Sequence, residues 1–434
     1  MKVFYQLAAN SFISGLSTML VWFALTLWVY TKTESVLATS LMSGIYLIAT
    51  ASTGIWFGSL VDHHKKKTMM ILSSIITLSS FCAAFAMYLL APPETFTSHS
   101  SPGLWLFVLT VFVGVIVANI RNIAMPTVVT LIVPEEDRDK ANGVLGTLMG
   151  IVFLLSSVIS GFLLATSGML WIFLMVIIFL FISIAHLATV NIPENKIVST
   201  HMEGEPVQKS SLKDTFASIQ KIPGLVPLIL FTSFNNFLGG VFMPLMDPYG
   251  LSLVSLEIWG VIWGFLSLGF IFGGIFIAKK GLGKNPLRTL FLVNIVLWID
   301  CILFTIQPSI WFLIVGMFIY ICLVPFIEAC EHTVIQKIVP QDRQGRVFGF
   351  AQSVESAASP LTALAIGPVA QFFFIPLMSE GGSGADLIGS WFGVGPGRGI
   401  ALVFMTAGML GLIVTNIAFR SGAYKALSQR YLAK

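Results

Sequence analysis

Charge is scarce in this sequence. Asp, Glu, Lys and Arg make up 10% of its 434 residues, whereas hydrophobic residues make up 56%. Soluble domains carry about 25% charged residues, and a soluble chain could not keep so much apolar surface away from water. The composition therefore excludes an ordinary soluble protein and predicts an all-α polytopic membrane protein.

The residues of common catalytic and metal sites are also few. The six histidines are scattered, no serine sits in a nucleophile elbow, and no glycine-rich loop precedes Lys-Ser or Lys-Thr. The four cysteines lie in apolar runs without Cys-x-x-Cys spacing, which indicates neither disulfides nor a metal site. We therefore expect no enzyme, no metal, no cofactor and no ATP-driven step within the chain. The net charge of +4 gives no indication of nucleic-acid binding.

Twelve apolar runs are each long enough to cross a hydrocarbon core, which takes about 20 residues. They lie at 4–29, 36–60, 68–91, 103–126, 141–165, 168–190, 223–246, 256–278, 286–306, 309–332, 347–376 and 399–420. With a cytoplasmic N-terminus, every Lys and Arg falls on cytoplasmic segments except Lys32 and Arg398 outside and Arg121 within the membrane. This asymmetry predicts cytoplasmic N- and C-termini. The glycine-rich outer segment 377–398 is expected to be a flexible loop.

The polar segment 191–222 divides the chain near its middle and is expected to be a cytoplasmic linker. It would separate an N-terminal six-helix bundle, 1–190, from a C-terminal bundle with a cytoplasmic tail, 223–434. A repeat supports this division, because Ile132-Val-Pro134 returns as Ile338-Val-Pro340, 206 residues later. In both copies an Asp-Arg pair and a glycine follow, with the Asp-Arg pair displaced by one residue: Asp137-Arg138 and Gly143, then Asp342-Arg343 and Gly349. Two pseudo-symmetric bundles are a known transporter design.

The turn between the second and third runs has the sequence Gly58-Ser-Leu-Val-Asp62-His-His-Lys-Lys-Lys67. Its lysines alone fit an ordinary positive-inside turn. The glycine four residues before an acid, followed by a basic run, resembles the loop between helices 2 and 3 of the major facilitator superfamily. Four residues match that pattern: Gly58, Asp62, Lys66 and Lys67. His63 and Lys65 stand where the family usually has Arg and Gly.

The twelve runs, the linker, this turn and the segment 133–143 make nearly the whole chain similar to that superfamily. Within it, the chain resembles the branch of bacterial macrolide and enterobactin exporters. The resemblance implies a cytoplasmic gate, in which Asp62 caps or pairs with the start of the eleventh helix, near Arg346. The gate would comprise Gly58, Asp62, Lys66, Lys67 and Arg346. The corresponding turn in the second half has Ala278 at the place of the acid, so only the first half would form this contact.

Several ionisable residues lie inside predicted helices, and five of them lie away from the interface or share a helix face with such a residue; a charge there costs at least about 2.5–3.5 kcal/mol without a partner or water. We expect these five to serve proton coupling: Arg121, Glu328, Glu331, Glu355 and Asp300. Glu328 and Glu331 share one helix face, and Glu355 lies at similar depth on the next helix, so a carboxylate cluster is feasible. In similar family members an arginine at the place of Arg121 is implicated in proton-dependent transport. The alternatives are an Arg121 packed against carbonyls, a Glu331 at a solvated helix end, and an Asp300 that only contacts a neighbouring helix.

Polar and aromatic residues on the helices that line the central cavity by resemblance are expected to meet the substrate. They are Asn10, Trp22, Asn119, Phe234, Asn235 and Gln352. Such a lining suits a lipophilic, or a cationic, compound, although aromatic residues in membrane helices more often serve packing.

The predicted function is a secondary transporter that exports lipophilic drugs or other amphiphiles in exchange for protons by alternating access. We expect a monomer in the lipid bilayer of the bacterial cytoplasmic membrane. Two features depart from proton-antiporting exporters. Ser156–Gly161 keeps only the last glycine of their Gly-Pro-x-x-Gly-Gly pattern, and the first helix has no acid. A dedicated exporter of a metabolite or siderophore, an importer, and a membrane sensor that does not transport are the alternatives.

Overall fold

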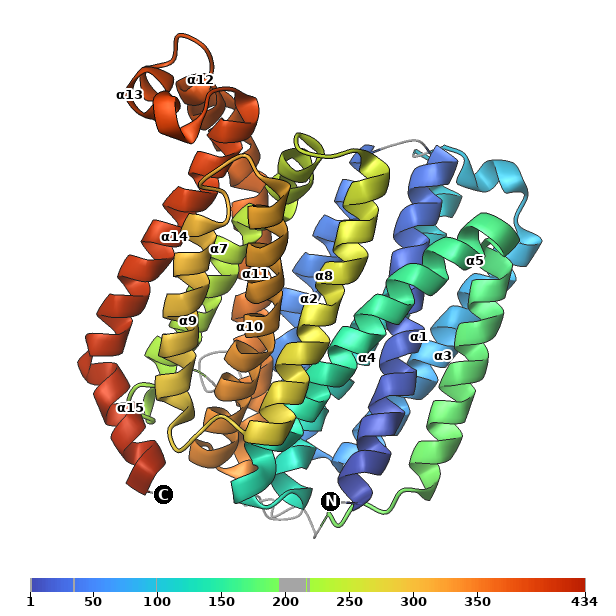
Figure 1. Cartoon of the computed structure of the whole chain (residues 1–434). Helices are drawn as coiled ribbons and strands as arrows, with labels where there is room; N and C mark the ends of the chain where they lie inside the picture. The colour runs from blue at the N-terminus through green and yellow to red at the C-terminus, as the bar shows by residue number, and fades with distance from the viewer. Residues whose placement is uncertain (1, 34–35, 99, 195–215, 217–218, 434) are drawn as a thin grey trace. The chain divides into compact units, whose positions relative to one another are not determined.

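The computed structural model of the chain (Figure 1) describes residues 2–33, 36–98, 100–194, 216 and 219–433. In that part of the chain all regular elements are helical. The long helices are α1 (Lys2–Thr33), α2 (Val36–His63), α3 (Lys66–Leu90), α4 (Pro102–Ile132), α5 (Arg138–Thr189), α7 (Leu225–Leu251), α8 (Leu256–Lys280), α9 (Pro286–Leu303), α10 (Ile310–Ile338), α11 (Gln344–Val369) and α14 (Pro396–Arg420). The shorter elements are η1 (Pro93–Phe96), η2 (Glu135–Asp137), η3 (Gln341–Arg343), the π-helix η4 (Ala370–Phe374), α12 (Ile375–Met378), α13 (Ser383–Phe392) and α15 (Gly422–Ala433).

Eleven stretches of helix among the described residues are long and apolar enough to cross a membrane. The longest, Glu135–Thr189, contains two spans, because the chain turns back at Gly168. Gly168 has φ 75° and ψ −177°, a conformation that glycine adopts without steric cost. The expected twelve spans are therefore confirmed. Of the predicted linker 191–222, residues 195–215 and 217–218 lie outside the described residues.

The outer segment 377–398 differs from the expected flexible loop, because residues Ser383–Phe392 form helix α13. The helix ends at Gly393, whose φ is 96°. Phe392 is fully buried, and the Arg398 guanidinium lies 3.8 Å from its ring centroid. Arg398 also donates to the carbonyls of Thr305 and Ile306, both at 2.9 Å. The cation–π contact attaches α13 to the start of α14, and the hydrogen bonds attach the start of α14 to the residues that follow α9.

The chain divides into two compact units. Unit 1 comprises residues 1–141, 148–215 and 335–353, and unit 2 comprises residues 142–147, 216–334 and 354–434. In the core of unit 1, buried Trp28 packs against Tyr88, Phe96 and Phe107 with ring centroids 5.2–5.9 Å apart. In unit 2, Trp298 is buried against Gly411, where any larger side chain would overlap the indole. A small residue thus lets α9 and α14 approach closely, as is common between membrane helices.

The repeated Ile-Val-Pro segments fold alike. In both copies the proline starts a single 3-10 turn, with a hydrogen bond to its carbonyl from the residue three positions later, at 3.0 Å. Arg138 then donates to the carbonyls of Thr130 and Val133 at the end of α4. In the second copy, Gln344 donates to the carbonyls of Gln336 and Val339, both at 3.0 Å. These two residues lie 206 positions after Thr130 and Val133.

These contacts correct the expected pairing within the repeat. The structural counterpart of Arg138 is Gln344, whereas the sequence comparison paired it with Arg343. No one-residue slip is present, because both side chains close the last turn of the preceding helix and satisfy carbonyls that the helix leaves free. Arg343 instead pairs with its neighbour Asp342 at the exposed surface.

Candidate functional site

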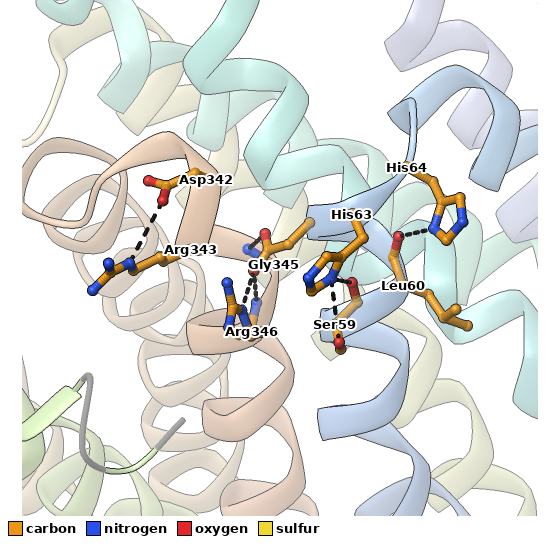
Figure 2. A network of polar contacts seen from close by, with 9 residues as sticks. Ser59, Leu60, His63, His64, Asp342, Arg343, Gly345 and Arg346 are labelled. Carbon is orange, nitrogen blue, oxygen red and sulfur yellow. Dashed lines mark hydrogen bonds and ion pairs between the residues drawn. The ribbon is translucent and has the colours of Figure 1, made fainter. Parts of the chain in front are cut away.

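The turn from α2 to α3 carries a buried carboxylate that binds the start of α11 within unit 1 (Figure 2). Asp62 accepts hydrogen bonds from the backbone nitrogens of Gly345 at 2.6 Å and Arg346 at 2.8 Å, and from Arg346 Nε at 3.2 Å. The first amides of a helix have no partner within the helix, and they carry the positive end of its dipole. Asp62 therefore caps α11 from a different helix, which is the contact that the sequence comparison implied.

Glycines bring the two backbones together at this contact. A side chain at Gly58 would overlap the carbonyl of Gly345, and one at Gly345 would lie 2.6 Å from the carbonyl of Gly58. The histidines of the turn do not take part. His63 and His64 donate from Nδ1 to the carbonyls of Ser59 and Leu60 on their own helix, at 2.8 and 3.0 Å.

A second carboxylate, Glu194, caps the start of α3. Its two oxygens accept from the backbone nitrogens of Lys66 and Lys67, each at 2.7 Å, and Lys67 Nζ donates to the carbonyl of Ala188. Glu194 was missed in the sequence because it lies 127 residues from Lys67 and outside the motif. The only sequence signal is an acid directly after an apolar span.

Arg121 is buried in unit 1, on α4, and is bound by uncharged groups. Its guanidinium donates to Asn10 Oδ1 at 2.6 Å and to Ser74 Oγ at 2.9 Å. Asn10 has no exposed surface, and its Nδ2 contacts the Ser183 carbonyl at 2.7 Å and His186 Nδ1 at 3.2 Å. Within the described residues, no carboxylate forms an ion pair with Arg121. Asn10 thus lies in a hydrogen-bonded network rather than on an open surface.

Three of the expected acids lie near one another in unit 2. The carboxyl groups of Glu331 on α10 and Glu355 on α11 are hydrogen-bonded to each other. Thr232 on α7 donates to Glu331 Oε1 at 3.4 Å. Glu328 lies one turn before Glu331 on α10 and is exposed. It is ten residues, or about 15 Å, from the end of α10, and Glu355 lies about 16 Å from the start of α11.

Asp300 lies apart from these three acids. It is on α9, where its Oδ1 is close to Gly316 on α10 and its Oδ2 is buried without a hydrogen-bond partner. Gly316 is twelve residues, about 18 Å, from Glu328 along α10. The structure thus brings together three of the four expected acids.

The residues expected to line the cavity occur in both units. In unit 1, Trp22 packs on Tyr46 with ring centroids 4.4 Å apart, and Asn119 Oδ1 accepts from Asn122. In unit 2, Phe234 stacks on Phe237 at 6.4 Å. Several buried amide atoms have no hydrogen-bond partner: Nδ2 of Asn119, both Oδ1 and Nδ2 of Asn235, and Oε1 of Gln352. In the described part of the chain, no three His, Cys, Asp or Glu side chains are grouped to hold a metal ion.

The fold and these residues define a polytopic helical membrane protein with acids inside its spans and a carboxylate of the α2–α3 turn that caps α11. A sequence profile of the Major Facilitator Superfamily matches residues 7–363. The chain belongs to this superfamily of transporters, so a small-molecule substrate and a membrane location follow.

Characterised relatives and solved structures agree with this assignment. Macrolide efflux protein A of Streptococcus pyogenes is 24% identical over 373 residues, which cover 82% of this chain and 87% of the relative. The protein of that name from Enterococcus faecalis is 24% identical over 335 residues, 74% of this chain and 97% of the relative.

Two solved structures show the same fold. A bacterial homologue of the iron transporter ferroportin, in an outward-facing state, matches with a TM-score of 0.70 and 13% identity, over 97% of this chain and 100% of that chain. The human organic anion transporter MFSD10 matches with a TM-score of 0.68 and 12% identity, over 95% and 99%.

Proposed function

We propose that this protein exports lipophilic amphiphiles in exchange for protons, by alternating access. Membership of the transporter superfamily supports transport, and the name of the curated relatives, macrolide efflux protein, supports export of a large amphiphile. In this proposal the protein is a monomer in the bacterial cytoplasmic membrane, with both termini in the cytoplasm. The halves 1–190 and 223–434, joined by the linker 191–222, rock about a cavity at the membrane midplane.

The carboxyl pair in unit 2 is the observation on which the proton coupling rests. An ionised carboxylate can only accept hydrogen bonds, so a bond between Glu331 and Glu355 needs a proton on one of them. Without that proton, two negative charges would face each other inside an apolar span, at a cost of several kcal/mol. A cationic group that approaches the pair offsets this cost and displaces the proton. Glu328, exposed one turn away, is the proposed first contact for such a cation.

The proposed gate is the Asp62 contact with Gly345 and Arg346, together with Gly58, Lys66 and Lys67. Its carboxylate holds the start of α11, a helix that begins in unit 1 and continues into unit 2 beyond residue 353. Arg121 is proposed to act with the acids in coupling. We assign substrate contact to Trp22, Asn119, Phe234, Asn235 and Gln352, whereas the network around Arg121 gives Asn10 a different role.

The test uses everted membrane vesicles, energised by respiration, with a pH-sensitive dye as reporter of the gradient. Lipophilic cations and macrolides are expected to collapse the gradient only when the protein is present. Glu355→Gln and Glu328→Gln are expected to abolish this response at unchanged expression. The matched control is Glu380→Gln, an exposed acid of the same unit between α12 and α13. Normal coupling in both of the first two variants would contradict the assignment of the proton site.

A dedicated exporter of one metabolite or siderophore is the second candidate. Asn235 supports it, because both polar atoms of its side chain are buried without a partner, as in a site built to hydrogen-bond a defined ligand. A response to a single compound in the same vesicles would favour this candidate. An absence of any response would favour import or a sensor that does not transport.

A further inference from the structure

The network around Arg121 joins three helical segments of unit 1 through one side-chain amide, that of Asn10. We infer that Asn10 and His186 are positioning residues for Arg121, and that His186 acts only as a neutral imidazole with its hydrogen on Nε2. The inference rests on the proposed function in one respect, namely that Arg121 takes part in coupled transport.

The orientation of the Asn10 amide is fixed by its neighbours. Arg121 has only donor atoms, so the atom of Asn10 that lies 2.6 Å from it must be the oxygen. The Ser183 carbonyl is only an acceptor, so the atom 2.7 Å from it must be the nitrogen. A flipped amide would set donor against donor at Arg121 and acceptor against acceptor at Ser183. Both contacts therefore select the same orientation.

This orientation determines the state of His186. Asn10 Nδ2 has two hydrogens and no free acceptor site, and it lies 3.2 Å from His186 Nδ1. His186 Nδ1 must accept, so it has no hydrogen, and the neutral ring carries its hydrogen on Nε2. A proton added at Nδ1 would point at the Asn10 amino group and break this hydrogen bond. It would also place a positive charge across one amide group from Arg121.

Charged groups around His186 add to this effect. Arg121 on α4 is positive and is joined to His186 through Asn10. Lys67 Nζ reaches the carbonyl of Ala188, two residues after His186. The nearby acid, Glu194, binds the backbone nitrogens of Lys66 and Lys67. The hydrogen bond from Asn10 to His186 thus supports the amide that holds Arg121.

Transport by two His186 variants tests this role. In His186→Asn the side-chain oxygen takes about the place of Nδ1 and accepts from Asn10, whereas His186→Leu cannot accept. We expect near wild-type transport for His186→Asn and a loss of about five- to tenfold for His186→Leu and for Asn10→Ala, the effect of one lost buried hydrogen bond. His64→Leu, at an exposed position directly after the end of α2, is the control.

A second measurement does not depend on transport. Nitrogen-15 NMR of the histidine rings in the full-length protein distinguishes the two neutral tautomers, and the His186 signal is assigned by its loss in His186→Asn. We expect the Nε2–H tautomer alone in the wild type and a mixture in Asn10→Ala. A hydrogen on Nδ1 in the wild type, or wild-type transport by His186→Leu, would overturn the inference. If neither the wild type nor any variant transports a compound, the proposed function fails. The tautomer of His186 then decides alone whether the inference about Asn10 and His186 holds.

Discussion

Replacing Asp62 by Asn should release the start of α11. The carboxylate is almost fully buried, with 1% of its side chain exposed, and it accepts three hydrogen bonds from Gly345 and Arg346. An asparagine has one acceptor oxygen, so its amino group would face one of the two backbone N–H groups. The change therefore removes the charge and also sets a donor against a donor.

The cost follows from these contacts. Hydrogen bonds to a charged group contribute about 1.5–3 kcal/mol each, and an unsatisfied buried donor costs about 1–3 kcal/mol. We expect a loss of roughly 3 kcal/mol in the free energy of opening this helix start, which corresponds to about 100-fold faster amide exchange. Hydrogen–deuterium exchange, read by mass spectrometry on a peptide that spans η3 and the first turn of α11, measures the change.

Asp342→Asn provides the matched control in the same peptide. Asp342 is 45% exposed at its side chain and contacts only the exposed Arg343, at 3.5 Å. Such a surface pair contributes about 0–1 kcal/mol, so exchange should change by fivefold or less. Equal exchange in Asp62→Asn and Asp342→Asn would refute the reasoning, because the buried cap would then contribute no more than a surface ion pair.

Two further predictions concern the same turn. Gly58→Ala should lower the melting temperature of the purified protein by a few degrees, because the added methyl group overlaps the Gly345 carbonyl and overpacking costs about 1–3 kcal/mol. Gly44 on the same helix has free space around it, so Gly44→Ala should leave the melting temperature unchanged. Equal shifts of the melting temperature in the two variants would count against a close backbone contact at Gly58. Glu194→Gln should speed amide exchange at Lys66 and Lys67 about tenfold, since one of two charge-assisted contacts is lost; unchanged exchange would exclude Glu194 as a cap.

The spans could be predicted from the sequence because each depends only on a local run of apolar residues. The Asp62 contact was predicted through the family pattern, although its partner lies 283 residues away. Glu194 and His186 were not predicted as members of a site, because single polar residues near helix ends are common and their partners come from distant segments. The helix at Ser383–Phe392 was missed for another reason, since glycine-rich composition favours a loop and the contact of Phe392 with Arg398 overrides it.

The repeat shows which residue of the second half corresponds to Asp62. A side chain at Gly54 would meet Ser353, and one at Gly274 would meet Thr147, which lies 206 residues before Ser353. Gly274 is thus the counterpart of Gly54. Asp62 lies eight residues after Gly54, so its counterpart is Leu282, eight residues after Gly274, and not Ala278 as expected from the sequence.

The start of α5 differs from the start of α11. The counterpart of Arg346 is Lys140, whose backbone nitrogen donates to the side chain of its neighbour Asp139 at 2.7 Å. The N-cap residue of α5, Asp137, makes no side-chain cap hydrogen bond, whereas the first turn of α11 is capped by Asp62 of α2. Loss of the charge on Asp62 can separate α11 from α2, but no equivalent change at Leu282 can release α5. The proposed gate therefore rests on the Asp62 contact with Gly345 and Arg346.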